Sequence, residues 1–220
     1  MSLIHQKYSS AIQKNTTTLS LKNPSTRHLQ LLSNPKLNNN TEAPEESKKQ
    51  KFESFLTYRK RLSRLALVQG IYFHEQFMQF TTIDLTNEEK VNEAYRTVIY
   101  FYKRMLFNGK YGTNKKNKKL EEKLVRSTIH QYITNAEMVD GLITKFLTKR
   151  WKLKMLNSVV RAGLRGAICE ALFSSKKQYK LITAEYTTLM ATLCTEEKEV
   201  DFFNAILDNI IKDIQKRYAK

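Results

Sequence analysis

The sequence has 220 residues, with 38 Lys or Arg against 21 Asp or Glu, which gives a formal net charge of +17. Such a charge favours anionic partners, namely RNA, DNA or an anionic membrane surface. No apolar run approaches the ~20 residues that a membrane span requires, and no secretory signal is recognisable, so we expect a cytoplasmic protein that does not insert into a membrane. The length is sufficient for one sizeable core or for two small helical bundles.

Residues 1–50 differ in composition from the rest of the chain. They are rich in Asn, Ser, Thr and Lys and contain all three prolines. No apolar period is present, so this segment is predicted to be a disordered extension. A start codon assigned too early would leave the same pattern.

Residues 45–220 contain no proline and few glycines, and apolar residues recur at helical spacing. This combination predicts an all-α fold. One polar, basic loop at 108–119 separates elements of the same unit. We expect helices at 55–79, 87–107, 119–134, 136–149, 151–174, 179–193 and 197–218.

The first predicted helix has a basic cluster at its N-terminal end, where acidic residues are normally favoured. An apolar stripe that includes Leu62 and Leu65 forms its core face. The cluster is either an ordinary solvated face or a site for an anion. The high net charge favours nucleic acid, since Arg can grip phosphates and stack on unpaired bases. The cluster consists of Arg59, Lys60, Arg61 and Arg64.

The predicted helices at 151–174 and 197–218 each have a clear apolar stripe. In the first, Lys154, Arg161 and Arg165 form a short basic row whose simplest interpretation is a solvated face, and Trp151 is expected to anchor packing. In the second, Phe202 lies about a third of a turn from the stripe. It either packs on a neighbouring element or is available to stack on a base.

Enzymatic chemistry has no support in the sequence. A Gly-rich phosphate loop and a nucleophile elbow are both missing. The four histidines are scattered without metal-ligand spacing. We therefore expect a non-enzyme without a cofactor or metal. Cys169 and Cys194 are expected to be buried thiols in a reducing compartment.

Three segments together resemble the bacterial transcription antitermination factor NusB family, over about residues 57–214. They are "SRLALVQGIY" (63–72), "VVRAGLRGAICEAL" (159–172) and "FFNAILDNI" (202–210), with "VDGLI" (139–143) at a fitting distance before the second. Ala184 and Ala205 depart from the family's Asn and Gly at these positions. Another departure is Ala171, which stands directly after Glu170 where the family usually has leucine.

The resemblance implies two packed three-helix bundles, with subdomains at about 51–135 and 136–220. It also implies binding to the boxA element of ribosomal RNA leader transcripts, as a heterodimer with the small-subunit ribosomal protein NusE, within an RNA polymerase antitermination complex. The family's RNA-contacting positions, carried over to this chain, fall on Arg59, Arg61, Arg64 and Phe202, and more loosely on Lys198. Lys60 joins them as a member of the basic cluster.

Two other interpretations are open. Similar domains serve as RNA-binding accessory parts of RNA cytosine methyltransferases, but such an enzyme would need a downstream catalytic domain. Alternatively, the chain is a basic structural protein, which would bind RNA only in a salt-sensitive way without sequence preference.

Overall fold

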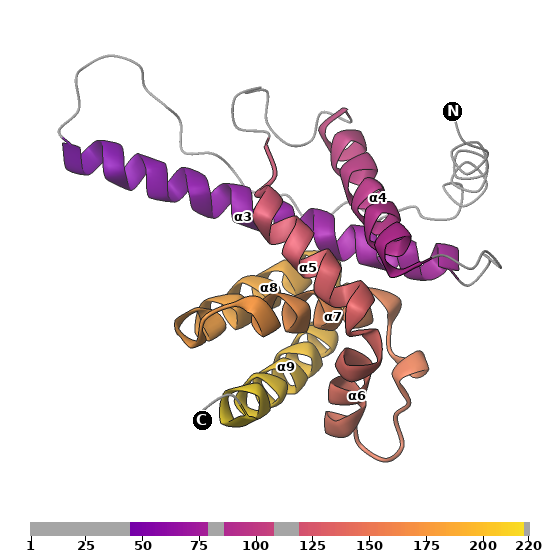
Figure 1. Ribbon diagram of the computed structural model, residues 1–220. Helices are drawn as coiled ribbons and strands as arrows, with labels where there is room; N and C mark the ends of the chain where they lie inside the picture. The colour runs from indigo at the N-terminus through magenta and orange to yellow at the C-terminus, as the bar shows by residue number, and fades with distance from the viewer. Residues whose placement is uncertain (1–44, 79–85, 108–118, 218–220) are drawn as a thin grey trace. The chain divides into compact units, whose positions relative to one another are not determined.

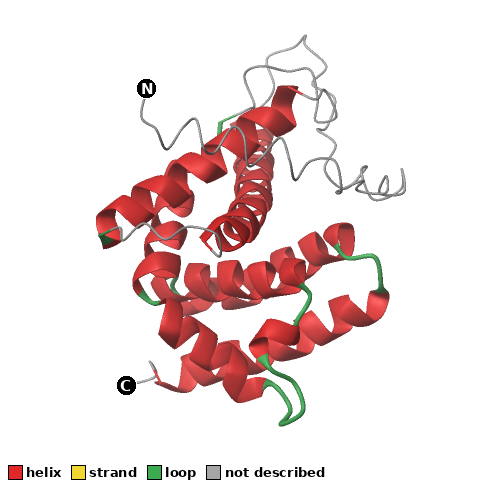
Figure 2. Ribbon diagram, turned by 90° about the vertical axis from the view of Figure 1, so that its right-hand side faces the viewer, coloured by secondary structure: helices red, strands yellow, loops and turns green. Residues whose placement is uncertain are grey.

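The computed structural model describes residues 45–78, 86–107 and 119–217 (Figure 1). Within these ranges the chain forms seven α-helices and no strand, which confirms the all-α prediction. Figure 2 shows these helices in red. The predicted extension lies outside the described residues, except that residues 45–50 belong to the first helix. The helices are α3 (Glu45–Met78), α4 (Asn87–Phe107), α5 (Glu122–Thr134), α6 (Ala136–Phe146), α7 (Ser158–Phe173), α8 (Tyr179–Leu193) and α9 (Glu197–Arg217).

The start of α7 differs from the prediction, which began this helix at Trp151. The helix begins at Ser158 because Asn157 caps it, its side-chain oxygen accepting a hydrogen bond from the N–H of Val159 at 2.9 Å. Residues 147–157, called the connector below, therefore join α6 to α7 and contain only one short 3₁₀ turn, Leu153–Met155. Three residues that the prediction placed on faces of a helix, Leu153, Lys154 and Leu156, lie in the connector instead.

The buried apolar side chains form two clusters. One lies among α3, α4 and α5, and includes Leu67, Val98 and Ile129. The other is enclosed by α7, α8 and α9, with α6 beside them, and takes further side chains from α3 and α5. Because α3 and α5 contribute to both clusters, the division into subdomains near residue 135 remains a prediction.

The apolar stripes predicted for α7 and α9 are buried. Phe203, Leu207 and Ile210 of α9 are each fully buried. The helices also approach closely: a Cβ on Gly70 of α3 would lie 2.2 Å from a methyl carbon of Val98 in α4, so this crossing requires glycine. Among the described helices, none is long and apolar enough to cross a membrane.

Candidate nucleic-acid interface

Arg64 lies inside the molecule, although its position in the basic cluster suggested a surface site. The residue is 4% exposed. Its Nε and Nη2 atoms donate to the carboxylate of Glu170 in α7 at 2.9 and 2.6 Å, and Nη1 is 3.5 Å from Glu185 of α8. Burial acts to lower the pKa of Arg64, but the hydrogen bonds and charge of Glu170 outweigh it and the pKa is raised. The guanidinium is thus a charged link between α3, α7 and α8.

Arg61 lies at the edge of the same network and is partly open to solvent. Its Nε and Nη2 atoms donate to both oxygens of Glu185 at 2.8 Å. The side chain of Arg61 is 39% exposed, whereas that of Glu185 is 8% exposed. Hydrogen bonding to Glu185 raises the pKa of Arg61. Glu185 therefore brings Arg61 and Arg64 together, and Arg61 still presents part of its guanidinium to solvent.

Arg59 fastens the segment that leads into α5. It donates to the carbonyl oxygens of Lys119 and Leu120 at 3.1 and 3.0 Å, and it lies 3.4 Å from the carboxylate of Glu121. Lys60 is half-buried and has no ion pair with any residue that the structure describes. Of the four cations in the cluster, three are bound to carboxylates of other elements.

The row formed by Arg161 and Arg165 in α7 is not a solvated face, which corrects the simplest interpretation of its sequence. Arg161 is 6% exposed, and its Nη2 lies 2.6 Å from Glu75 of α3. Arg165 donates two hydrogen bonds of 2.8 Å to Asp140 of α6 and also lies 3.1 Å from Glu75. These ion pairs join α3, α6 and α7. Buried Arg requires such partners, because an unpaired charge inside a protein is costly.

His74 lies beside this second ion-pair network. The residue is 5% exposed, and its Nδ1 is 3.3 Å from the hydroxyl of Tyr132. Burial, and secondarily the charge of Arg165, lowers the pKa of His74 to about 4. The ring is therefore neutral at physiological pH.

Phe202 lies in α9 beside the connector. Its ring centroid is 6.2 Å from that of Trp151, with 39° between the ring planes, and the side chain is half-buried. Trp151, the expected packing anchor, contacts Phe202 and yet remains 48% exposed. Lys198 is exposed in the first turn of α9, between Glu197 and Glu199.

The predicted site residues form two separate groups. The Arg64 network reaches α7 at Glu170, near the C-terminal end of that helix, whereas Asn157, the cap at its other end, donates to Glu199 of α9 at 2.7 Å. At 1.5 Å per residue these two positions of α7 lie about 20 Å apart. No hydrogen bond, ion pair or ring contact between described residues joins the α3 group directly to Lys198 or Phe202.

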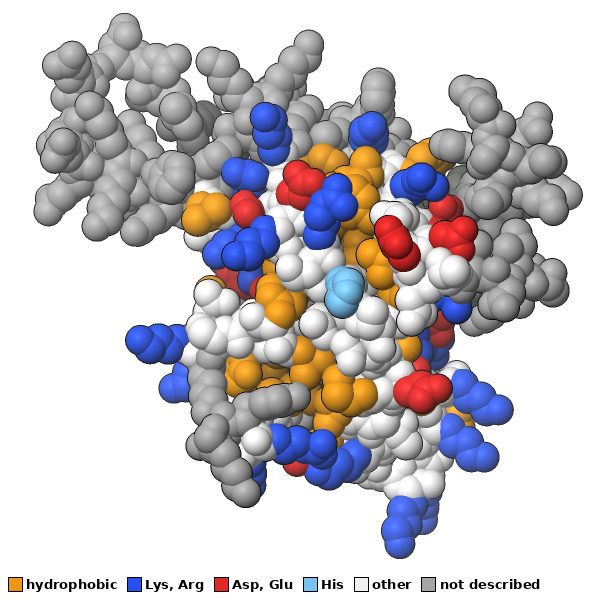
Figure 3. Space-filling view, viewed as in Figure 1, with side chains coloured by type: hydrophobic (Ala, Val, Ile, Leu, Met, Phe, Trp, Pro, Cys, Tyr) orange, Lys and Arg blue, Asp and Glu red, His pale blue; other side chains and the backbone are white. Residues whose placement is uncertain are grey.

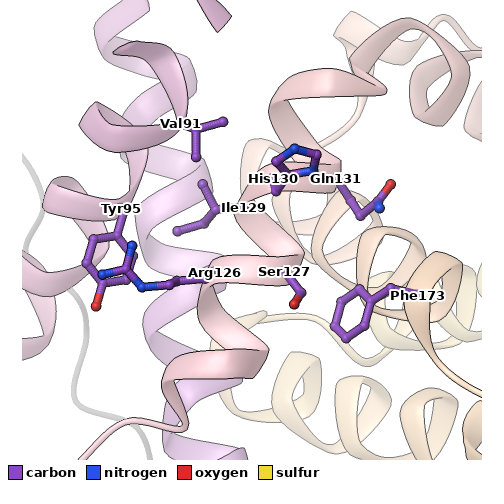
Figure 4. A pocket seen from close by; sticks show the side chains of 8 residues that line it. All are labelled: Val91, Tyr95, Arg126, Ser127, Ile129, His130, Gln131 and Phe173. Atoms are coloured by element: carbon purple, nitrogen blue, oxygen red, sulfur yellow. The ribbon is translucent and has the colours of Figure 1, made fainter. Parts of the chain in front are cut away.

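A hollow of about 370 Å³ lies between α4, α5 and the end of α7 (Figure 4). Arg126 lies over the ring of Tyr95, 4.1 Å from its centroid, and also donates to Glu122 at 2.8 Å. Phe173 and His130 line the opposite part. None of the predicted site residues lines this hollow. Nor do the described residues contain a group of His, Cys, Asp or Glu that could hold a metal ion.

The sequence analysis did not identify the carboxylates that pair with the buried Arg64, namely Glu170 and Glu185. Glu170 is the sole acidic residue of α7, and Glu185 is the sole acidic residue of α8. A lone acid within a long apolar helix is a signal for a buried ion pair, since its charge needs a partner. The sequence also indicates that Trp151 is exposed, because this residue stands among four cations in "KRWKLK" (149–154).

Both cysteines are free thiols. Cys169 is buried as expected, and burial raises the pKa of its thiol. Cys194 is only half-buried, which corrects the expectation for this residue.

Comparison with known proteins gives a consistent result. The model of the NusB family matches residues 61–212. A protein of Rickettsia bellii named "Transcription antitermination protein NusB" is 25% identical over 166 residues, covering 74% of this chain and 96% of that protein. Proteins of the same name from Rickettsia rickettsii and Rickettsia felis are 28% and 26% identical, covering 70% and 72% of this chain and 92% and 94% of their own lengths. No solved structure matches.

Proposed function

Because this chain belongs to the NusB family, we propose that it is a non-enzymatic transcription antitermination factor that binds RNA. The observation that carries the proposal is the family match, which covers residues 61–212 and so includes part or all of every described helix. The relatives bear the name of antitermination proteins. A net charge of +17 gives the chain a long-range attraction for polyanions.

The proposed ligand is a boxA-like single-stranded element of ribosomal RNA transcripts, bound together with NusE in an RNA polymerase antitermination complex. We assign direct contacts to residues that the fold leaves accessible, namely Lys60, Arg61, Lys198 and Phe202. Cations would meet phosphates, and Phe202 would stack on a base. Arg64 supports these contacts as a positioning residue through Glu185, which also holds Arg61, whereas Arg59 fastens the segment that leads into α5.

The test is fluorescence-anisotropy binding to a boxA-like RNA and to a scrambled RNA of equal composition, each with and without NusE, over a series of salt concentrations. We expect a preference for the boxA-like RNA that increases when NusE is present. Phe202→Leu and Arg61→Gln should weaken this preference. Equal binding of both RNAs without any effect of NusE would refute the proposal and would leave a basic protein that binds polyanions without sequence preference.

A further inference from the structure

The connector contains the densest group of accessible cations in the described chain. Lys149, Arg150, Lys152 and Lys154 are all exposed. None of the four forms an ion pair with a described residue, in contrast to the arginines of α3 and α7. In Figure 3, Lys and Arg side chains project from the lower right-hand edge, where Figure 1 places the connector. This segment therefore presents positive charge that no carboxylate of the described residues pairs with.

The connector is also held firmly, although it is mostly irregular. Leu156 is 5% exposed and belongs to the larger apolar cluster. Nη1 of the buried Arg161 donates to the carbonyl oxygens of Leu153 and Leu156 at 3.3 and 3.0 Å. Asn157 joins the end of the connector to α9 through Glu199. Side chains on such a fixed backbone lose less freedom when a ligand binds.

An aromatic surface accompanies these cations. Trp151 packs on Phe202 on one side and is 48% exposed, and Met155 nearby along the chain is 56% exposed. A solvent-exposed Trp among lysines has the composition of sites that bind single-stranded nucleic acid, in which bases stack on aromatic rings while cations follow the phosphates. Phe202, whose ring is next to the indole and half-buried, extends this aromatic surface onto α9.

From these observations we infer that the connector is a binding surface for single-stranded RNA, with Trp151 stacking on an unpaired base and the four connector cations contacting phosphates. This inference rests on the proposed function and extends its site from α9 to residues 149–155. The α3 group meets α7 about 20 Å along that helix from the end that the connector joins. An RNA strand that contacts both the α3 group and the connector would therefore have to span about this distance along α7.

Trp151 is the sole tryptophan of the chain, so its emission reports directly on this surface. We would titrate the full chain with oligouridylate, with the boxA-like RNA and, as an anionic control without bases, with polyglutamate. Stacking on a base should quench the emission. We expect quenching by both RNAs, with the same midpoint as anisotropy gives, and none by polyglutamate.

Two substitutions separate the ring from its packing role. Trp151→Ala should weaken RNA binding about tenfold, since this corresponds to the stacking of one base. Trp151→Phe retains an aromatic ring and should stay within about threefold of the unmodified chain. Circular dichroism and thermal unfolding check that both variants fold, and Leu181→Ala, at another exposed apolar side chain, is the matched control.

The outcomes distinguish this inference from the function on which it rests. Preferential boxA binding without a change in Trp151 emission, and with full affinity in Trp151→Ala, would overturn the connector surface and leave the proposed function intact. Quenching by both RNAs without any boxA preference would support the connector surface and count against the proposed function. Quenching by polyglutamate alone would overturn the inference in favour of an acidic protein partner.

Discussion

The basic residues at the start of α3 and those of the connector carry the same charge but have opposite surroundings. In α3, Arg59, Arg61 and Arg64 each meet a carboxylate from a distant part of the chain. In the connector, the four exposed cations have no such partner among the described residues. A basic cluster in a sequence therefore has two meanings. The carboxylates that the fold brings to it decide whether it stabilises the protein or remains available to a ligand.

The residue types agree with this difference. The paired cations are arginines, whose planar guanidinium can hold a carboxylate through two parallel hydrogen bonds, as Arg61 and Arg165 do. Three of the four connector cations are lysines, which are strongly hydrated and flexible. Arg is thus used where charge is enclosed, and Lys is used mainly where charge faces water.

The largest expected effect comes from breaking the buried pair. Glu170→Gln removes the nearer of the two carboxylates that face Arg64, whose side chain is 5% exposed, and leaves only Glu185 at 3.5 Å. Leaving a buried charge without its main partner should lower the free energy of unfolding by about 3–5 kcal/mol. Urea denaturation measures the change.

The matched control for this change removes both charges. Arg64→Met combined with Glu170→Leu should recover much of the lost stability, because a buried pair replaced by apolar side chains is often close to neutral. A Glu170→Gln variant as stable as the unmodified chain would mean that Arg64 is not enclosed, and the contrast between the two basic regions would fail.

A smaller effect should appear as a dependence of stability on pH. Burial and Arg165 lower the pKa of His74 to about 4 from an ordinary 6.5. Below pH 6.5 the unfolded chain binds a proton at His74 that the folded chain does not, so stability falls as the pH decreases towards 4. At pH 5 the loss should be about 2 kcal/mol relative to pH 7.

Urea denaturation at pH 7 and pH 5 measures this loss. His74→Gln removes the titrating group, and the difference between the two pH values should shrink by the same amount. An identical pH dependence in the unmodified chain and in His74→Gln would contradict the assignment.

Arg61 is intermediate between the two regions, being both paired and partly exposed. Arg61→Lys retains the charge but loses the two parallel hydrogen bonds to Glu185, and should cost about 1 kcal/mol of stability. Arg61→Gln should cost a similar amount and should also weaken RNA binding, which Arg61→Lys should largely preserve. Equal RNA affinity in both variants would assign Arg61 to the fold alone.

The sequence was sufficient for the helices and the core stripes, because apolar spacing depends on the local chain alone. The stripe through Phe203, Leu207 and Ile210 is an example. The sequence was not sufficient to predict that Arg64 and Arg161 are buried in ion pairs. Their partners are distant in the sequence, and only the tertiary fold brings them close. The start of α7 was misplaced because the apolar period continues through Leu153 and Leu156, and the period does not reveal that Asn157 caps the helix.

The smallest expected effect on stability belongs to the connector, and it gives the sharpest contrast with α3. Lys149→Gln combined with Arg150→Gln removes two exposed cations and should change the free energy of unfolding by less than about 0.5 kcal/mol. If each cation contacts one phosphate of a single strand, the slope of log K against log salt should become about 1.4 less negative. Lys123→Gln with Lys180→Gln, which removes two exposed cations from α5 and α8, should leave this slope unchanged. Equal slopes in the two double variants would mean that the connector attracts RNA only through the net charge of the protein. The position of a cation matters for a direct contact with a phosphate, but not for this long-range attraction.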